Sequence, residues 1–159
     1  MIKRIIIGIL FFASGIGIGI FSDSFFRQLI QDLFQWTTNN GIQFGGKDFY
    51  LFGNPISFIS FGLTSLLFYH SNKTNKFSKI LWNGIILIII FGIGLISISA
   101  LNAHFKIIEC TACDNGIRRL GYNEIYYGLI IALSLLFSII PSLIKIIKNL
   151  KKANVQQRV

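Results

Sequence analysis

The chain has 159 residues, of which 53% are hydrophobic, and its fifteen Lys and Arg outnumber its six Asp and Glu, giving a net charge of +9. So apolar a composition excludes an ordinary soluble protein and favours an integral membrane protein.

The first apolar run covers about residues 4–21 and follows Lys3 and Arg4, as the apolar part of a signal sequence would. Its glycine-rich end lacks a persuasive small-x-small cleavage site, so we expect a retained helix. The chain continues with "DSFFRQLIQDLFQW" at 23–36, where apolar and aromatic residues recur at helical spacing opposite charged and amide side chains. This pattern predicts an amphipathic helix on the membrane surface.

The stretch "TNNGIQFGGKDFYLFG" at 38–53 alternates turn-forming residues with aromatic residues. Such alternation predicts a short hairpin or cradle loop outside the membrane. Taken alone, Asn39 and Asn40 are typical of a simple turn.

Three further apolar runs follow, at about 54–70, 81–103 and 124–147. Each is close to the 17–25 residues that cross a bilayer as a helix, and unpaired backbone groups cannot face lipid. We therefore predict an all-α membrane protein, a single domain over 1–159 with four transmembrane helices. The glycines in "SGIGIGI" and "FGIGLIS" are expected at close contacts between these helices.

The segment "ECTACDNG" contains the two cysteines of the chain, Cys110 and Cys113, in C-x-x-C spacing. A structural disulfide is one interpretation, and a redox-active dithiol is another. The second would make the protein a membrane thiol-disulfide oxidoreductase that resembles the quinone-coupled disulfide oxidases, although those enzymes relay electrons between two cysteine pairs. A zinc site with His104 would have only three ligands, so no metal or cofactor is expected.

The basic residues divide unequally between the two sides of a four-span topology. Ten lie on one side, namely Lys3, Arg4, Lys73, Lys76, Lys79, Lys145, Lys148, Lys151, Lys152 and Arg158, and five lie on the other, namely Arg27, Lys47, Lys106, Arg118 and Arg119. The positive-inside rule then predicts that both termini are cytoplasmic. Attraction to anionic membrane lipid accounts for the charge, and no nucleic-acid partner is expected.

Short polar motifs flank the apolar runs in a definite order. D-x-x-x-[K/R] follows the first run, N-x-G-x-x-F lies in the next loop, an asparagine ends the third run, and "YNEIY" at 122–126 opens the fourth. This order resembles the prolipoprotein signal peptidase (signal peptidase II) family, four-helix aspartic peptidases of the bacterial inner membrane that cut signal peptides from lipid-modified lipoproteins. The resemblance implies a substrate-binding role for Asp23, Arg27, Asn39, Gly41, Phe44, Asn102 and Asn123.

The two catalytic aspartate positions of that family fall on Phe105 and Tyr126 here. Neither side chain can replace a carboxylate pair that shares a proton and activates water. The nearest acids are Glu109, Asp114 and Glu124. We therefore expect a multi-pass inner-membrane protein that binds lipoprotein, signal peptide or lipid without Asp-dyad hydrolysis. A small structural subunit of a larger membrane complex is the remaining alternative.

Overall fold

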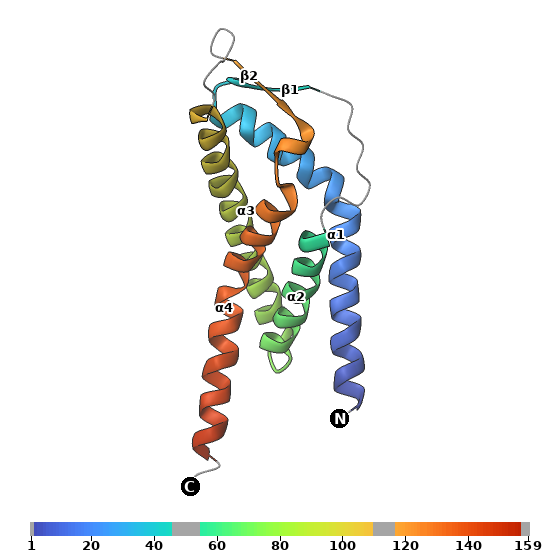
Figure 1. The fold of residues 1–159 in the computed structure, drawn as a ribbon. Coiled ribbons are helices and arrows are strands. Elements are labelled where there is room, and N and C mark those ends of the chain that lie inside the picture. The colour runs from blue at the N-terminus through green and yellow to red at the C-terminus, as the bar shows by residue number, and fades with distance from the viewer. Residues whose placement is uncertain (1, 46–54, 110–116, 157–159) are drawn as a thin grey trace.

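The computed structural model describes residues 2–45, 55–109 and 117–156. Four helices account for most of this part, and two short strands join them at one end (Figure 1). In chain order the elements are α1 (Ile2–Thr37), β1 (Ile42–Gly45), α2 (Pro55–Asn72), α3 (Phe77–Ile108), β2 (Arg118–Gly121), the 3-10 helix η1 (Tyr122–Glu124) and α4 (Tyr127–Gln156).

Three of the helices are long and apolar enough to cross a membrane, over Ile5–Thr37, Phe77–Ile108 and Tyr127–Asn149. Their isoleucine, leucine and phenylalanine side chains are largely exposed on the outside of the bundle. Such a surface is favourable in lipid and costly in water. The predicted second span corresponds to α2, which has 18 residues and ends in the polar sequence "YHSN".

The bundle has two chemically different ends. Figure 1 shows the strands at one end, while the start of α1, the turn between α2 and α3 and the end of α4 lie at the other. We call the first the strand end and the second the lysine end, because Lys73, Lys76 and Lys79 lie in or next to that turn and Lys145 and Lys148 lie in the last part of α4.

The predicted span at 4–21 and the predicted surface helix at 23–36 are a single helix, so their separation in the sequence analysis was wrong. No proline or helix-ending glycine lies between them, and an Asp23–Arg27 ion pair at i, i+4 spacing supports the continuous helix. The second half of α1 turns across the strand end beneath β1 and β2 (Figure 1). Its apolar face, with Ile30 and Phe34, is buried in the protein core, whereas we expected it to lie on the membrane.

Of the segment predicted as a hairpin or cradle loop at 38–53, the structure describes residues 38–45. Thr38–Asn40 form a turn in which Asn39 and Asn40 have φ angles of 50° and 59°, and β1 then pairs in parallel with β2, Ile42 opposite Arg118. A hairpin would add an antiparallel strand from the same loop, and residues 46–54, which would supply it, lie outside the described part, so the hairpin stays a prediction.

The core lies beneath this strand pair. Its fully buried large side chains come from α1, both strands and α4: Ile30, Phe34, Ile42, Leu120, Ile130 and Ile131. Alternation along the strands directs Ile42 and Leu120 inwards. The strands therefore close the strand end of the bundle over an apolar interior.

The expected glycine contacts are confirmed at some positions. A Cβ atom on Gly15 would lie 2.5 Å from the Phe61 carbonyl oxygen, and one on Gly62 would lie 2.8 Å from the Phe12 ring. Helices α1 and α2 thus approach at glycines, as small residues permit. By contrast, Gly17 and Gly92 face open space.

Candidate functional site

Polar side chains at every fourth position of α1 face the first residue of α4. Arg27 Nε donates to Asp23 Oδ2 at 2.7 Å, and the guanidinium carbon of Arg27 lies 5.6 Å from the ring centroid of Tyr127. One turn further, Gln31 Nε2 donates to Tyr127 Oη at 2.9 Å. The spacing i, i+4, i+8 places all three on one face of α1, so the predicted D-x-x-x-[K/R] motif is part of a contact between α1 and α4.

Asp23 is the most deeply buried acid among the described residues. Its residue exposure is 9%, and its second oxygen, Oδ1, is buried with no hydrogen-bond partner in the described part of the chain. An ionised carboxylate accepts several hydrogen bonds, and a buried acceptor left unpaired is costly. Asp23 Oδ1 therefore has capacity for a further donor from water or from a bound molecule.

An apolar cavity of about 560 Å³ lies among the four helices next to this cluster. Phe26 and Leu29 of α1 line it, and Phe26 is one turn after Asp23 on the same helix. The other walls come from α2, α3 and α4, including Phe61, Phe91 and Leu135. Its volume is within the range of small-molecule sites, and its lining suits a hydrocarbon group.

In the predicted resemblance, Phe105 and Tyr126 occupy the positions at which the signal peptidase II family has its catalytic aspartates, and both lie on the surface. Phe105 is 56% exposed and Tyr126 is 69% exposed. Glu109 pairs with Lys106 at 3.5 Å, and Glu124 pairs with Arg118 at 3.7 Å. Each of these glutamates is thus paired with a basic side chain, and the described residues include no group of three or more His, Cys, Asp and Glu that could hold a metal ion.

The predicted N-x-G-x-x-F residues lie in the turn and strand that cover the strand end. Asn39 is exposed, and its side chain forms no hydrogen bond with the described residues. The Gly41 carbonyl accepts from the Arg118 backbone N–H at 2.8 Å. Phe44 stacks on Tyr122, with ring centroids 5.9 Å apart. In the structure Gly41 and Phe44 therefore hold β1 against β2 and η1.

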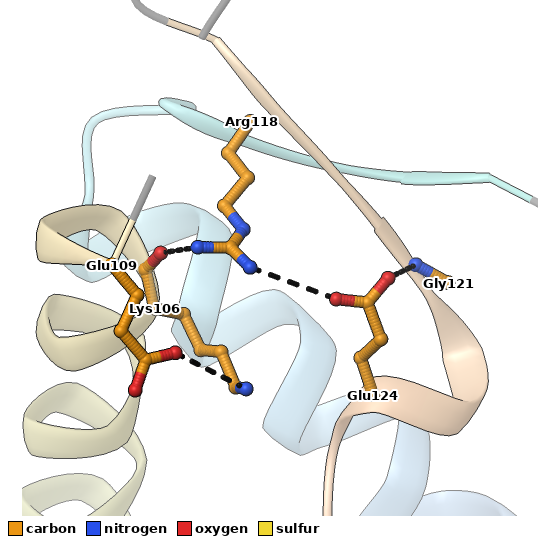
Figure 2. Close-up of polar contacts among 5 residues, drawn as sticks. All are labelled: Lys106, Glu109, Arg118, Gly121 and Glu124. Atoms are coloured by element: carbon orange, nitrogen blue, oxygen red, sulfur yellow. Dashed lines mark hydrogen bonds and ion pairs between the residues drawn. The ribbon is translucent and has the colours of Figure 1, made fainter. Parts of the chain in front are cut away.

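Arg118 connects three elements at the strand end (Figure 2). Its Nη1 donates to the Lys106 carbonyl near the end of α3, and its Nη2 faces Glu124 Oε2. Glu124 Oε1 in turn accepts from the Gly121 backbone N–H at 2.9 Å. The charge-assisted contacts of Arg118 thus fix β2 relative to both α3 and η1.

The other predicted site residues are less informative. Asn102 is partly buried on α3, and its side chain has no hydrogen bond to any described residue. Asn123 belongs to η1, and its side chain lies outside the described part. Cys110 and Cys113 fall in residues 110–116, which are also outside it.

Sequence reasoning did not identify Gln31, Tyr127, Arg118 or Glu124 as interacting residues. The four-residue spacing of Asp23, Arg27 and Gln31 was a signal for Gln31, since side chains so spaced share a helix face. No comparable local pattern indicates the other three, because their partners belong to different elements.

A scan against protein-family models finds no match. Comparisons with curated proteins and with solved structures find none either.

Proposed function

We propose that the protein is a multi-pass membrane protein of the inner membrane that binds a ligand with a hydrocarbon chain: a lipoprotein, a lipid-modified signal peptide or a lipid. The proposal combines the signal-peptidase-II-like order of motifs with the geometry at the strand end. It places that end on the outer side of the membrane.

The observation that carries the proposal is the cavity of about 560 Å³ between the four helices. Its lining is almost entirely apolar, and its polar lining residues are Thr64 and Ser65. Burial of an acyl chain there is favourable by roughly 0.8 kcal/mol for each CH₂ that leaves water. When the acyl chain moves into the cavity from lipid instead of from water, the free-energy gain depends on how closely the chain packs against the cavity wall.

Asp23 supports a ligand that also carries a hydrogen-bond donor. Its Oδ1 has no partner in the described structure, and the apolar cavity begins one turn away at Phe26. A peptide N–H or a headgroup hydroxyl of the ligand can supply the missing donor once the side chains that bury Oδ1 move aside. The arrangement thus suits a molecule that joins a polar group to a hydrocarbon chain.

The test is a substitution that fills the cavity without disturbing existing contacts. A Cβ on Gly92, which lines the cavity, would meet nothing within 4 Å, and neither would one on Gly17, which is not among the lining residues. We expect Gly92→Leu to weaken binding by about tenfold or more, since each CH₂ that the leucine side chain excludes loses its packing contacts with the cavity wall. Gly17→Leu is the matched control and should bind as the wild type does.

Binding is measured with the protein in nanodiscs, by the fluorescence anisotropy of a synthetic diacylglyceryl-cysteine peptide and of the same peptide without acyl chains. If Gly92→Leu and Gly17→Leu bind the lipidated peptide equally, the cavity is not the acyl site. If both peptides bind wild type equally, the acyl chain makes no contribution.

The proposed activity does not include cleavage by an aspartate dyad. Phe105 and Tyr126 occupy the relevant positions, and no pair of described carboxylates is placed to activate water. Incubation with a lipidated prolipoprotein should leave the substrate intact. Cleavage that disappears in Asp114→Asn or Glu124→Gln would contradict this part of the proposal.

The proposed topology has four crossings, with α2 as the second, and cytoplasmic termini. Its support is the 10:5 division of basic residues and the position of the lysines at the end opposite the strands. A reporter fused after Val159 should be active in the cytoplasm and inactive outside. The oxidoreductase alternative stays a prediction, because Cys110 and Cys113 lie outside the described residues.

A further inference from the structure

A second, smaller cavity of about 80 Å³ lies next to the apolar cavity described above, on the side of the lysine end, and Leu87 lines both. Residues of α2, α3 and α4 line this partly open cavity, and its polar lining residues are Ser71, Asn83, Ser138, Ser142 and Lys145. One water needs about 10–15 Å³ on this measure. The cavity therefore has room for a group of several heavy atoms.

Asn72 organises the polar groups next to the cavity. Its Oδ1 accepts from Asn75 Nδ2 and Asn83 Nδ2, both at 2.6 Å, and from Lys145 Nζ at 3.4 Å. Asn72 is buried, and its own amide nitrogen donates to Ser71 Oγ and to a backbone carbonyl. The amide oxygen of Asn72 is therefore already shared among three donors.

Donors with remaining capacity surround the cavity. Lys145 has three N–H groups and only one long hydrogen bond, and Asn83 has a second amide hydrogen. The Ser142 hydroxyl forms no hydrogen bond to a described residue. These groups come from two helices and face one small space, which is the arrangement that a bound oxyanion requires.

Lys145 has no counter-ion in the described structure. The ion pairs of the described residues are Asp23–Arg27, Lys106–Glu109 and Arg118–Glu124, and all of them lie towards the strand end. Lys73, Lys76, Lys79 and Lys148 add further positive charge at the lysine end. A partly buried ammonium group held only by a neutral amide oxygen is electrostatically unfavourable, and an anion from outside the chain would compensate it.

We propose that this cavity binds a phosphate group, with Lys145, Asn83 and Ser142 as its donors. The phosphate belongs to the headgroup of an anionic phospholipid or is free inorganic phosphate. Ile86 and Leu87 also line the cavity and give the remainder of a lipid an apolar surface. The proposal does not depend on the acyl site, because Lys145, Asn83 and Ser142 do not line the apolar cavity, although Leu87 lines both.

The test compares Lys145→Gln with Lys148→Gln. Both substitutions remove one positive charge from α4, but Lys148 is exposed and is not a lining residue. The purified full-length chain in detergent is incubated with phosphatidylglycerol or with phosphatidylcholine of the same acyl chains, and bound lipid is counted by native mass spectrometry. Inorganic phosphate is titrated in a parallel series.

We expect wild type to retain phosphatidylglycerol in preference to phosphatidylcholine. Lys145→Gln should reduce this retention about tenfold, as loss of a charge-assisted hydrogen bond predicts, whereas Lys148→Gln should change it less than about twofold. If inorganic phosphate binds wild type, displaces the lipid and fails to bind Lys145→Gln, the phosphate site is confirmed with free phosphate as its ligand. Equal effects of the two variants, or equal retention of the two lipids, would overturn the proposal.

Ser142→Ala provides a second test if Lys145→Gln does not fold. It leaves every charge unchanged and removes a hydroxyl with no described partner. We expect a loss of roughly threefold in phosphatidylglycerol retention. Retention equal to that of wild type would contradict the assigned donor set.

Discussion

Replacement of Arg118 by methionine should loosen the strand end without unfolding the helices. The Arg118 side chain is 17% exposed, and its hydrogen bond to the Lys106 carbonyl joins a charged donor to the end of α3. Loss of such a bond costs about 1.5–3 kcal/mol. Its ion pair with Glu124 spans 3.7 Å, and Glu124 is 45% exposed, so solvent screening limits this pair to about 0.2–1 kcal/mol.

The two contributions sum to about 2–4 kcal/mol for opening of the strand pair, or roughly a 30-fold to several-hundredfold change in the opening equilibrium. Hydrogen exchange followed by mass spectrometry should show this acceleration in peptides that cover β1 and β2. Methionine retains much of the apolar stem of arginine, which limits any packing effect.

Arg119→Met is the matched control, because Arg119 is the next residue of β2 and is exposed. It should exchange as the wild type does. If Arg118→Met and Arg119→Met accelerate exchange equally, the contacts in Figure 2 do not stabilise the strand end and our reasoning is wrong. Glu124→Gln should have a smaller effect than Arg118→Met, since it removes only the screened ion pair.

Two further pairs of variants test contacts between helices. Gly15→Ala should lower the stability in detergent by about 1–3 kcal/mol, because its Cβ would lie 2.5 Å from a backbone carbonyl oxygen of α2, while Gly17→Ala should be neutral or slightly stabilising. Thermal unfolding of the two alanine variants measures the difference, and equal midpoints would contradict the close approach of α1 and α2. Tyr127→Phe should cost about 1 kcal/mol, because the Gln31 amide loses its acceptor, whereas Tyr126→Phe should have no effect since Tyr126 is exposed. A comparable loss in Tyr126→Phe would show that the Gln31 hydrogen bond is not the cause.

Helix positions were predictable because a membrane-spanning helix requires one long apolar run, and a single window of the sequence shows such a run. The runs predicted at 54–70, 81–103 and 124–147 correspond to α2, α3 and α4 within a few residues at most boundaries. The prediction ended all three of them too early, because polar ends such as "NAHFKII" at 102–108 remain helical after the apolar run stops. Hydropathy locates the apolar centre of a helix better than its ends.

The N-terminal helix and the strands required information that no local window contains. Asp23 and Arg27 interrupt the apolar run without interrupting the helix, since they form an ion pair one turn apart. The parallel pairing of β1 with β2 depends on a segment that lies between α3 and α4. Turn-rich sequence at 38–53 is equally compatible with a hairpin, so only the three-dimensional structure identifies the partner.

The candidate site was likewise predictable only in part. The Asp23–Arg27 motif could be found from its spacing, and both side chains do lie together. Tyr127 could not be found, because its role depends on how α4 packs against α1.

The parallel pairing of β1 and β2 also imposes an order on biosynthesis. Ile42 and its partner Arg118 are 118 − 42 = 76 residues apart, and ribosomes add about 5–20 residues per second. For roughly 4–15 s, β1 has therefore been synthesised while its partner has not. The edge of β1 that pairs with β2 stays unpaired during this interval, and unpaired edges are prone to aggregate with other strands. Closure of the strand end must wait until α3 has also been synthesised, so it belongs to the last steps of assembly.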